Sequence, residues 1–148
     1  MLLYFLFAYF LERSDFLNLL LLYSGLFYAA WKIIQHTKFN FWIWAVIGIT
    51  ARVLFLPSIP NLSQDFYRFI WDGRMILEGF NPYLFTVASF FTKDQFPIVQ
   101  AQELYAGMGN LNASNYTNYP PINQLCFIIA GLFAGKSILG SVIVMRIL

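Results

Sequence analysis

The apolar run Phe16–Ile34 reads FLNLLLLYSGLFYAAWKII. A helix needs roughly 20 mostly apolar residues to cross a bilayer, and this run is about that long. Lys32 is its one charged residue. The stretch therefore predicts a membrane-spanning helix.

The composition of the whole chain agrees with a membrane protein. Its 148 residues are 59% hydrophobic, 20% aromatic and 11% charged, whereas soluble domains carry about 25% charged residues. The net charge of +2 comes from scattered basic residues, so no nucleic acid is expected as a partner. The single cysteine, Cys126, excludes a disulfide within the chain and a Cys-based metal site.

Four further apolar runs predict additional spans and an all-α, polytopic fold: residues 1–11, 41–57, 121–134 and 138–148. The first is short, so it is either a clipped span or an interfacial helix. The last stops inside an apolar run, and we therefore expect an N-terminal fragment of a longer protein. A single bent helix across Gly135 is an alternative to the last two spans.

The long polar segment, residues 58–120, is predicted to be extracytoplasmic. Lys32 and Lys38 flank the connector before residues 41–57, and the positive-inside rule places that connector in the cytoplasm. The loop itself carries three basic and five acidic residues. We thus expect a multi-pass protein of the cell membrane with a large external loop.

The most informative part of this loop, Asn61–Tyr83, reads NLSQDFYRFIWDGRMILEGFNPY. Ser63 is a candidate N-cap and Gly79 a candidate terminator, which predicts a helix of about 15 residues. An apolar stripe holds Phe66, Ile70, Gly73 and Leu77. The helix is therefore expected to lie on the membrane surface with this stripe facing the bilayer.

A second stripe of the same helix groups three charged side chains. Asp65, Arg68 and Asp72 fall within an arc of about 60°. This grouping suits a site where a hydroxyl is deprotonated and a phosphate leaving group is neutralised. The alternative is a set of surface ion pairs at helical spacing, as for Arg74 and Glu78.

Three motifs in order resemble the GT-C superfamily of integral membrane glycosyltransferases. An apolar span ending at Pro57 and Pro60 is followed by SQDFYRFIWDG, then by GFNPY, and later by NYPP before the next span. The resemblance is strongest to bacterial mannosyltransferase-like members that use polyprenyl-phosphate sugars. It covers roughly residues 52–146.

The resemblance implies an inverting hexosyl transfer, with mannose a candidate sugar. The donor would be a polyprenyl-phosphate sugar, and the acceptor a glycan, lipid or protein outside the cytoplasm, in a bacterial inner membrane. Asp65 matches the family's candidate general base, and Arg68 or Arg74 would neutralise the leaving phosphate. Many members carry paired acids in this loop, whereas Gln64 precedes Asp65 here. Asp72 is therefore assigned to substrate binding, and no metal or cofactor is predicted.

Four other residues are candidates for substrate binding. Asn81 and Tyr83 belong to a turn that ends the helix. The alternative to substrate binding is that they only cap this helix. Tyr119 would shape the donor groove, or simply mark where the chain enters the membrane. Arg52 lies near the outer end of its span, where it either snorkels to the interface or meets a lipid phosphate.

Two functions of other classes remain open from the sequence. A transporter or flippase of lipid-linked sugars would place charges at mid-membrane, whereas here eight of the sixteen charged residues lie in the loop. In a non-catalytic scaffold, Asp65, Arg68 and Asp72 would be freely replaceable. Membrane lipids surround the chain under any of these functions.

Overall fold

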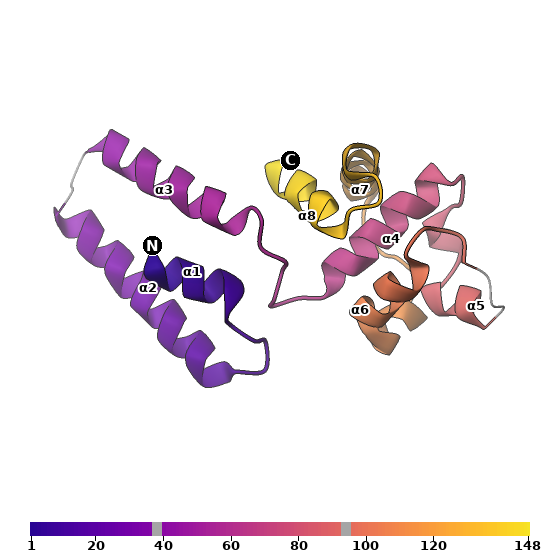
Figure 1. Cartoon of the computed structure of the whole chain (residues 1–148), viewed down its shortest axis with the longest axis horizontal. Helices are drawn as coiled ribbons and strands as arrows, with labels where there is room; N and C mark the ends of the chain where they lie inside the picture. Colours follow the sequence, from indigo (N-terminus) through magenta and orange to yellow (C-terminus); the bar gives the residue numbers. More distant parts are fainter. Residues whose placement is uncertain (37–39, 93–95) are drawn as a thin grey trace. The chain divides into compact units, whose positions relative to one another are not determined.

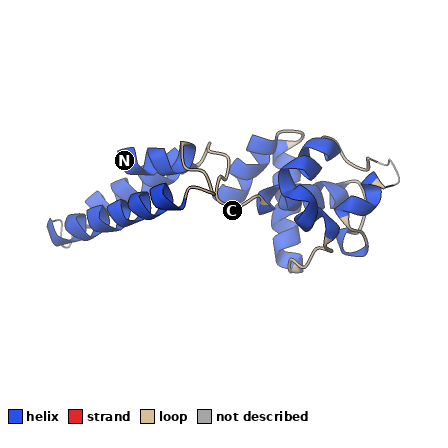
Figure 2. Cartoon of the chain, turned by 90° about the horizontal axis from the view of Figure 1, so that it is seen from below, coloured by secondary structure: helices blue, strands red, loops and turns tan. Residues whose placement is uncertain are grey.

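The computed structural model describes residues 1–36, 40–92 and 96–148, and these form helices and turns without any strand (Figures 1 and 2). This confirms the all-α expectation. Contacts divide the chain into two compact units, Met1–Leu62 and Ser63–Leu148. The elements in chain order are α1 (Leu2–Tyr9), α2 (Phe16–His36), α3 (Phe41–Phe55), α4 (Asp65–Leu77), the 3₁₀ helix η1 (Pro82–Leu84), α5 (Val87–Phe91), α6 (Ala101–Ser114), α7 (Pro121–Ala134) and α8 (Ile138–Ile147).

Local signals mark several helix ends. The Asn40 side chain accepts a hydrogen bond from Ile43 N at 3.3 Å at the start of α3. Ser137 caps α8 in the same way, accepting from Gly140 N at 2.9 Å. Between α7 and α8, Gly135 has φ 55°, a conformation that glycine adopts readily. The two helices are therefore separate, and not one bent helix.

In the first unit, α1 packs against both α2 and α3. The ring of Phe55 lies 5.7 Å from that of Tyr4 and 6.1 Å from that of Phe7. Tyr9 Oη donates to the carbonyl of Leu54 at 3.0 Å. The Asn61 amide donates to the carbonyls of Phe7 and Leu11. These bonds tie α1 to the end of α3 and the segment after it.

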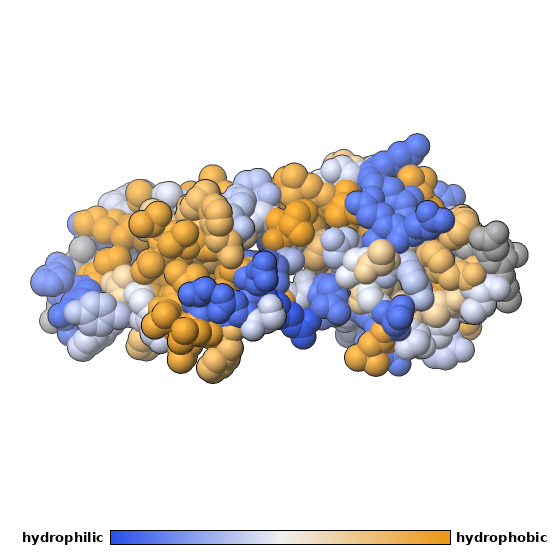
Figure 3. All heavy atoms as spheres, turned by 60° about the horizontal axis from the view of Figure 1, so that its bottom comes forward, coloured by the Kyte–Doolittle hydropathy of each residue, from blue (hydrophilic) through white to orange (hydrophobic). Residues whose placement is uncertain are grey.

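The outer surface of the first unit is largely apolar. Helices α2 and α3 bury none of their residues, and apolar side chains cover much of this unit on the face seen in Figure 3.

Among the described residues, α2 alone is long and apolar enough to cross a membrane, with a mean hydropathy of 1.4. A signal sequence near an N-terminus meets the same criterion. Shorter apolar helices are α3, α7 and α8. Lys38, Lys93 and Asp94, which contribute to the topology prediction, lie outside the described residues.

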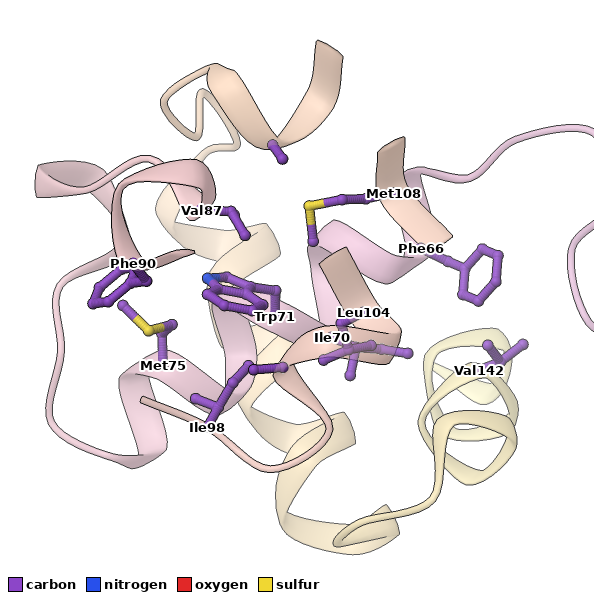
Figure 4. Packing of buried hydrophobic residues seen from close by; sticks show 12 residues of the cluster. Phe66, Ile70, Trp71, Met75, Val87, Phe90, Ile98, Leu104, Met108 and Val142 are labelled. Atoms are coloured by element: carbon purple, nitrogen blue, oxygen red, sulfur yellow. The ribbon is translucent and has the colours of Figure 1, made fainter. Parts of the chain in front are cut away.

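Helix α4 lies at the centre of the second unit, packed against both α6 and α7. Of its 13 residues, 8 are buried. Figure 4 shows Trp71 among Met75, Val87 and Phe90, which come from α4 and α5. The prediction that this helix lies on a surface is therefore wrong. The reason is that α6 covers one of its faces and α7 another, so Arg68 and Asp72 of its polar stripe are enclosed together with most of its apolar stripe.

Glycine allows α4 and α7 to approach closely. A Cβ added to Gly73 would overlap the carbonyl oxygen of Phe127, and one added to Gly131 would lie 2.7 Å from Leu77 Cδ1. These close contacts lie in the C-terminal half of α4.

We expect Gly73→Ala to destabilise the second unit by about 1–3 kcal/mol, because the added methyl group meets backbone that cannot rotate away. The free energy of unfolding of the full chain in detergent measures this. Gly48→Ala in α3 is the control, since a Cβ there has nothing within 4 Å and alanine favours a helix by about 1 kcal/mol. Equal stability of the two variants would contradict the close contact.

Candidate functional site

A buried ion pair on α4 is the centre of the site. Arg68 Nε donates to Asp72 Oδ1 at 2.9 Å, and the two side chains are 2% and 0% exposed. The sequence correctly predicts that these residues are neighbours at helical spacing. It is wrong about where they lie, because the pair is enclosed instead of forming a surface pair.

Hydrogen bonds from other elements complete this pair. Arg68 Nη1 donates to the carbonyl oxygens of Asn112 at 3.2 Å and Asn115 at 3.0 Å. Asp72 Oδ2 accepts from Gln124 Nε2, on α7, at 3.1 Å. A buried charge is tolerated when it is paired and hydrogen-bonded. The pair thus joins the end of α6, α4 and α7 in one polar network.

Asp65 lies at the exposed edge of this network. Its Oδ1 accepts from Asn112 Nδ2 at 3.1 Å and its Oδ2 accepts from Ser63 Oγ at 2.9 Å. It is the first residue of α4, where the helix dipole favours a carboxylate. Ser63 also accepts from Asp65 N at 3.2 Å. Asp65 is thus a solvent-accessible acceptor in a fixed orientation.

A kink in α6 brings the two asparagines to α4. Gly109 has φ 75° and ψ 162° within the helix, values that glycine adopts far more readily than other residues. The chain after this kink carries Asn112 and Asn115, whose backbone and side-chain groups meet Arg68 and Asp65. Both asparagines begin Asn-X-Ser/Thr sequences, but that pattern gives no sign of their contacts.

Beside the ion pair is a polar cavity of about 340 Å³. Its wall is built from amides, hydroxyls and one guanidinium, groups that donate and accept hydrogen bonds in several directions. Such a lining suits a ligand rich in hydroxyl groups better than an apolar one. The lining residues are Arg68, Asn112, Asn115, Tyr116, Thr117, Asn118 and Tyr119.

Tyr119 stands between this cavity and the aromatic part of the unit. Its ring lies 4.9 Å from that of Phe69 in an edge-to-face arrangement. Burial raises the pKa of Tyr119, the negative charges of Asp65 and Asp72 raise it further, and Arg68 opposes them. Its phenol therefore stays protonated, and able to donate a hydrogen bond, beyond the usual pH range of a tyrosine.

The structure also connects two of the sequence motifs. Tyr83 Oη donates to the carbonyl of Tyr119 at 2.5 Å, so the turn after α4 meets the segment before α7. Asn81 Oδ1 accepts from Tyr83 N at 3.0 Å and caps the start of η1, whereas the capping interpretation places Asn81 in the turn that ends the preceding helix. Tyr83 and Tyr119 are therefore held together.

Two predicted site residues lie elsewhere. Arg74 bonds to the carbonyl of Val99 and to Gln100 Oε1, on the side of α4 opposite Asp65. These two bonds, and not the expected ion pair with Glu78, fix the position of Arg74. Arg52 is exposed in the last turn of α3, within the first unit.

Sequence reasoning missed Asn112, Asn115, Thr117 and Gln124 as members of the network. Gln124 is buried inside an apolar helix. A glutamine within an apolar run was the one signal that the sequence offered. Among the described residues, no three His, Cys, Asp or Glu side chains come together as metal ligands. No protein-family model, curated protein or solved structure matches the chain.

Proposed function

We propose that the chain belongs to an inverting glycosyltransferase of the membrane. It would move a hexose, with mannose the first candidate, from a polyprenyl-phosphate donor to a glycan, lipid or protein acceptor outside the cytoplasm. The observation that carries the proposal is Asp65, an exposed carboxylate oriented by Ser63 and Asn112. Asn112 also lines the polar cavity with Arg68.

In this mechanism Asp65 is the general base. It takes the proton of an acceptor hydroxyl as that oxygen attacks the anomeric carbon of the donor. The bond from this carbon to the phosphate oxygen breaks, and its electron pair leaves with the polyprenyl phosphate. One attack from the face opposite the leaving group inverts the configuration, and no carboxylate nucleophile is required.

Arg68 and the amides would supply binding and charge. The Arg68 guanidinium lines the cavity while Asp72 compensates its charge in the interior. Positive charge near a departing phosphate stabilises the transition state. Asn115, Asn118 and Tyr119 supply further hydrogen-bonding groups for sugar hydroxyls.

A polytopic membrane arrangement is part of this proposal. Helices α1, α2 and α3 would be its membrane segments, and the residues after α3 would face the outside. The support is the apolar exterior of α2 and α3, together with a donor whose polyprenyl chain keeps it in the bilayer.

A transporter of lipid-linked sugars is the second candidate. It is favoured by one observation, the Arg68–Asp72 pair buried beside α7. Ionisable residues enclosed among membrane helices often mark a substrate pathway. The two candidates differ in whether the bond between sugar and phosphate is broken.

The test is a transfer assay with the complete protein in proteoliposomes. With polyprenyl-phosphate mannose supplied, we expect release of polyprenyl phosphate and mannose linked to an acceptor, and no transfer from a nucleotide-linked mannose. Donor that crosses the bilayer intact would instead establish the transporter. An intact donor that stays where it was supplied would contradict both candidates.

A further inference from the structure

A second polar site lies at the other end of α4. At about 100° per residue, Arg74 projects from the side opposite Asp65, and it is about 13 Å further along the helix axis. It is 6% exposed. Whatever binds there is therefore distinct from a ligand at Asp65.

The Arg74 guanidinium is only partly satisfied. Nη1 donates to Val99 O at 2.9 Å and to Gln100 Oε1 at 3.1 Å. Nε and Nη2 are shielded from water and have no acceptor among the described residues. Burial lowers the pKa of Arg74, and the charge of Glu103 opposes this effect. A buried donor without a partner is costly, most of all on a charged group.

Arg74 also lines a small cavity of about 190 Å³. Lys136, in the turn between α7 and α8, adds a second cation to it, and Glu78 adds one exposed carboxylate. Its volume is below that of typical pockets for whole small-molecule ligands, roughly 300 Å³ and more. The remaining wall is mostly apolar: Leu77, Ile98 and Val99.

We propose that this cavity binds a phosphate group between Arg74 and Lys136. The adjacent Nε and Nη2 of an arginine offer two parallel N–H bonds to two oxygens of one anion. The Lys136 ammonium would take a third oxygen, which a phosphate has and a carboxylate lacks. A small side-chain rotation, common when a ligand binds, turns the guanidinium to the cavity.

Two nearby acidic residues, Glu78 and Glu103, are the groups that would compete with phosphate for Arg74. Glu103 accepts a hydrogen bond from Gln100 Nε2 at 2.8 Å, and Gln100 in turn accepts from Arg74. Gln100 has φ 59°, a backbone conformation that costs energy in a non-glycine residue. If Glu78 or Glu103 turns to Arg74, the protein itself fills the site and phosphate does not bind.

The experiment is a calorimetric titration of the full chain in neutral detergent with inorganic phosphate. We expect saturable binding of one phosphate, weakened about tenfold or more in Lys136→Gln and in Arg74→Lys, because each loses a charge-assisted bond. Lys136 is exposed, so its variant should fold normally. Lys32→Gln removes the same charge in the first unit and should leave binding unchanged.

The absence of saturable binding would overturn the proposal, as would equal binding by Lys136→Gln and Lys32→Gln. Nanodiscs separate the two sources of phosphate. Loss of phosphate binding in phosphatidic acid nanodiscs, but not in phosphatidylcholine, would assign the site to a lipid headgroup. Equal binding in both would assign it to a free phosphate. Neither nanodisc measurement requires sugar transfer, so the phosphate-binding result is independent of the proposed enzyme activity.

Discussion

Asp65→Asn should reduce sugar transfer by about 100-fold or more, because the amide keeps the size of the side chain and cannot take a proton. Donor binding should be retained, since Arg68 and the cavity amides are unchanged. The measurement is initial transfer rate in proteoliposomes at matched expression. Glu12→Gln, which also neutralises an exposed acid, is the control and should transfer at the parental rate.

A second readout shows whether the variant changes only the charge. Asp65 contributes to the raised pKa of Tyr119, so the pKa of Tyr119 should fall in Asp65→Asn. Tyrosinate absorbance at alkaline pH, compared with Tyr119→Phe, reports this shift. A lowered Tyr119 pKa with unchanged transfer would mean that the general base lies elsewhere.

Asp72→Leu should instead cost stability, by about 3–5 kcal/mol, because it leaves Arg68 buried without its partner charge. The expected result is a lower free energy of unfolding in detergent, with amide exchange accelerated in α4, α6 and α7. Asp65→Asn is the matched control, because Asp65 is exposed and its loss removes no enclosed partner.

The double variant Arg68→Met with Asp72→Leu separates pairing from packing. Replacing a buried ion pair with apolar residues of similar volume is often neutral or stabilising. We expect it to recover most of the stability that Asp72→Leu loses, yet to show no sugar transfer, since the cavity has lost its cation. A cost below about 1 kcal/mol for Asp72→Leu alone would show that water reaches the pair.

The sequence by itself determined most of the helices, although it did not predict α5 and α6. Apolar runs and caps act over a few residues, so Phe16–Ile34 and residues 121–134 could be read as helices, and the structure has α2 and α7 there. The prolines at 120 and 121 mark the start of α7. The proximity of Arg68 and Asp72 follows from helical spacing alone.

Only the tertiary structure decided which faces are covered. An amphipathic pattern gives the direction of each side chain around α4, but not that α6 and α7 both pack on it. Burial of Arg68–Asp72, the position of Asn112 beside Asp65 and the unsatisfied donors of Arg74 all depend on residues distant in the chain. Such long-range contacts arise from packing of whole helices, and no local pattern encodes them.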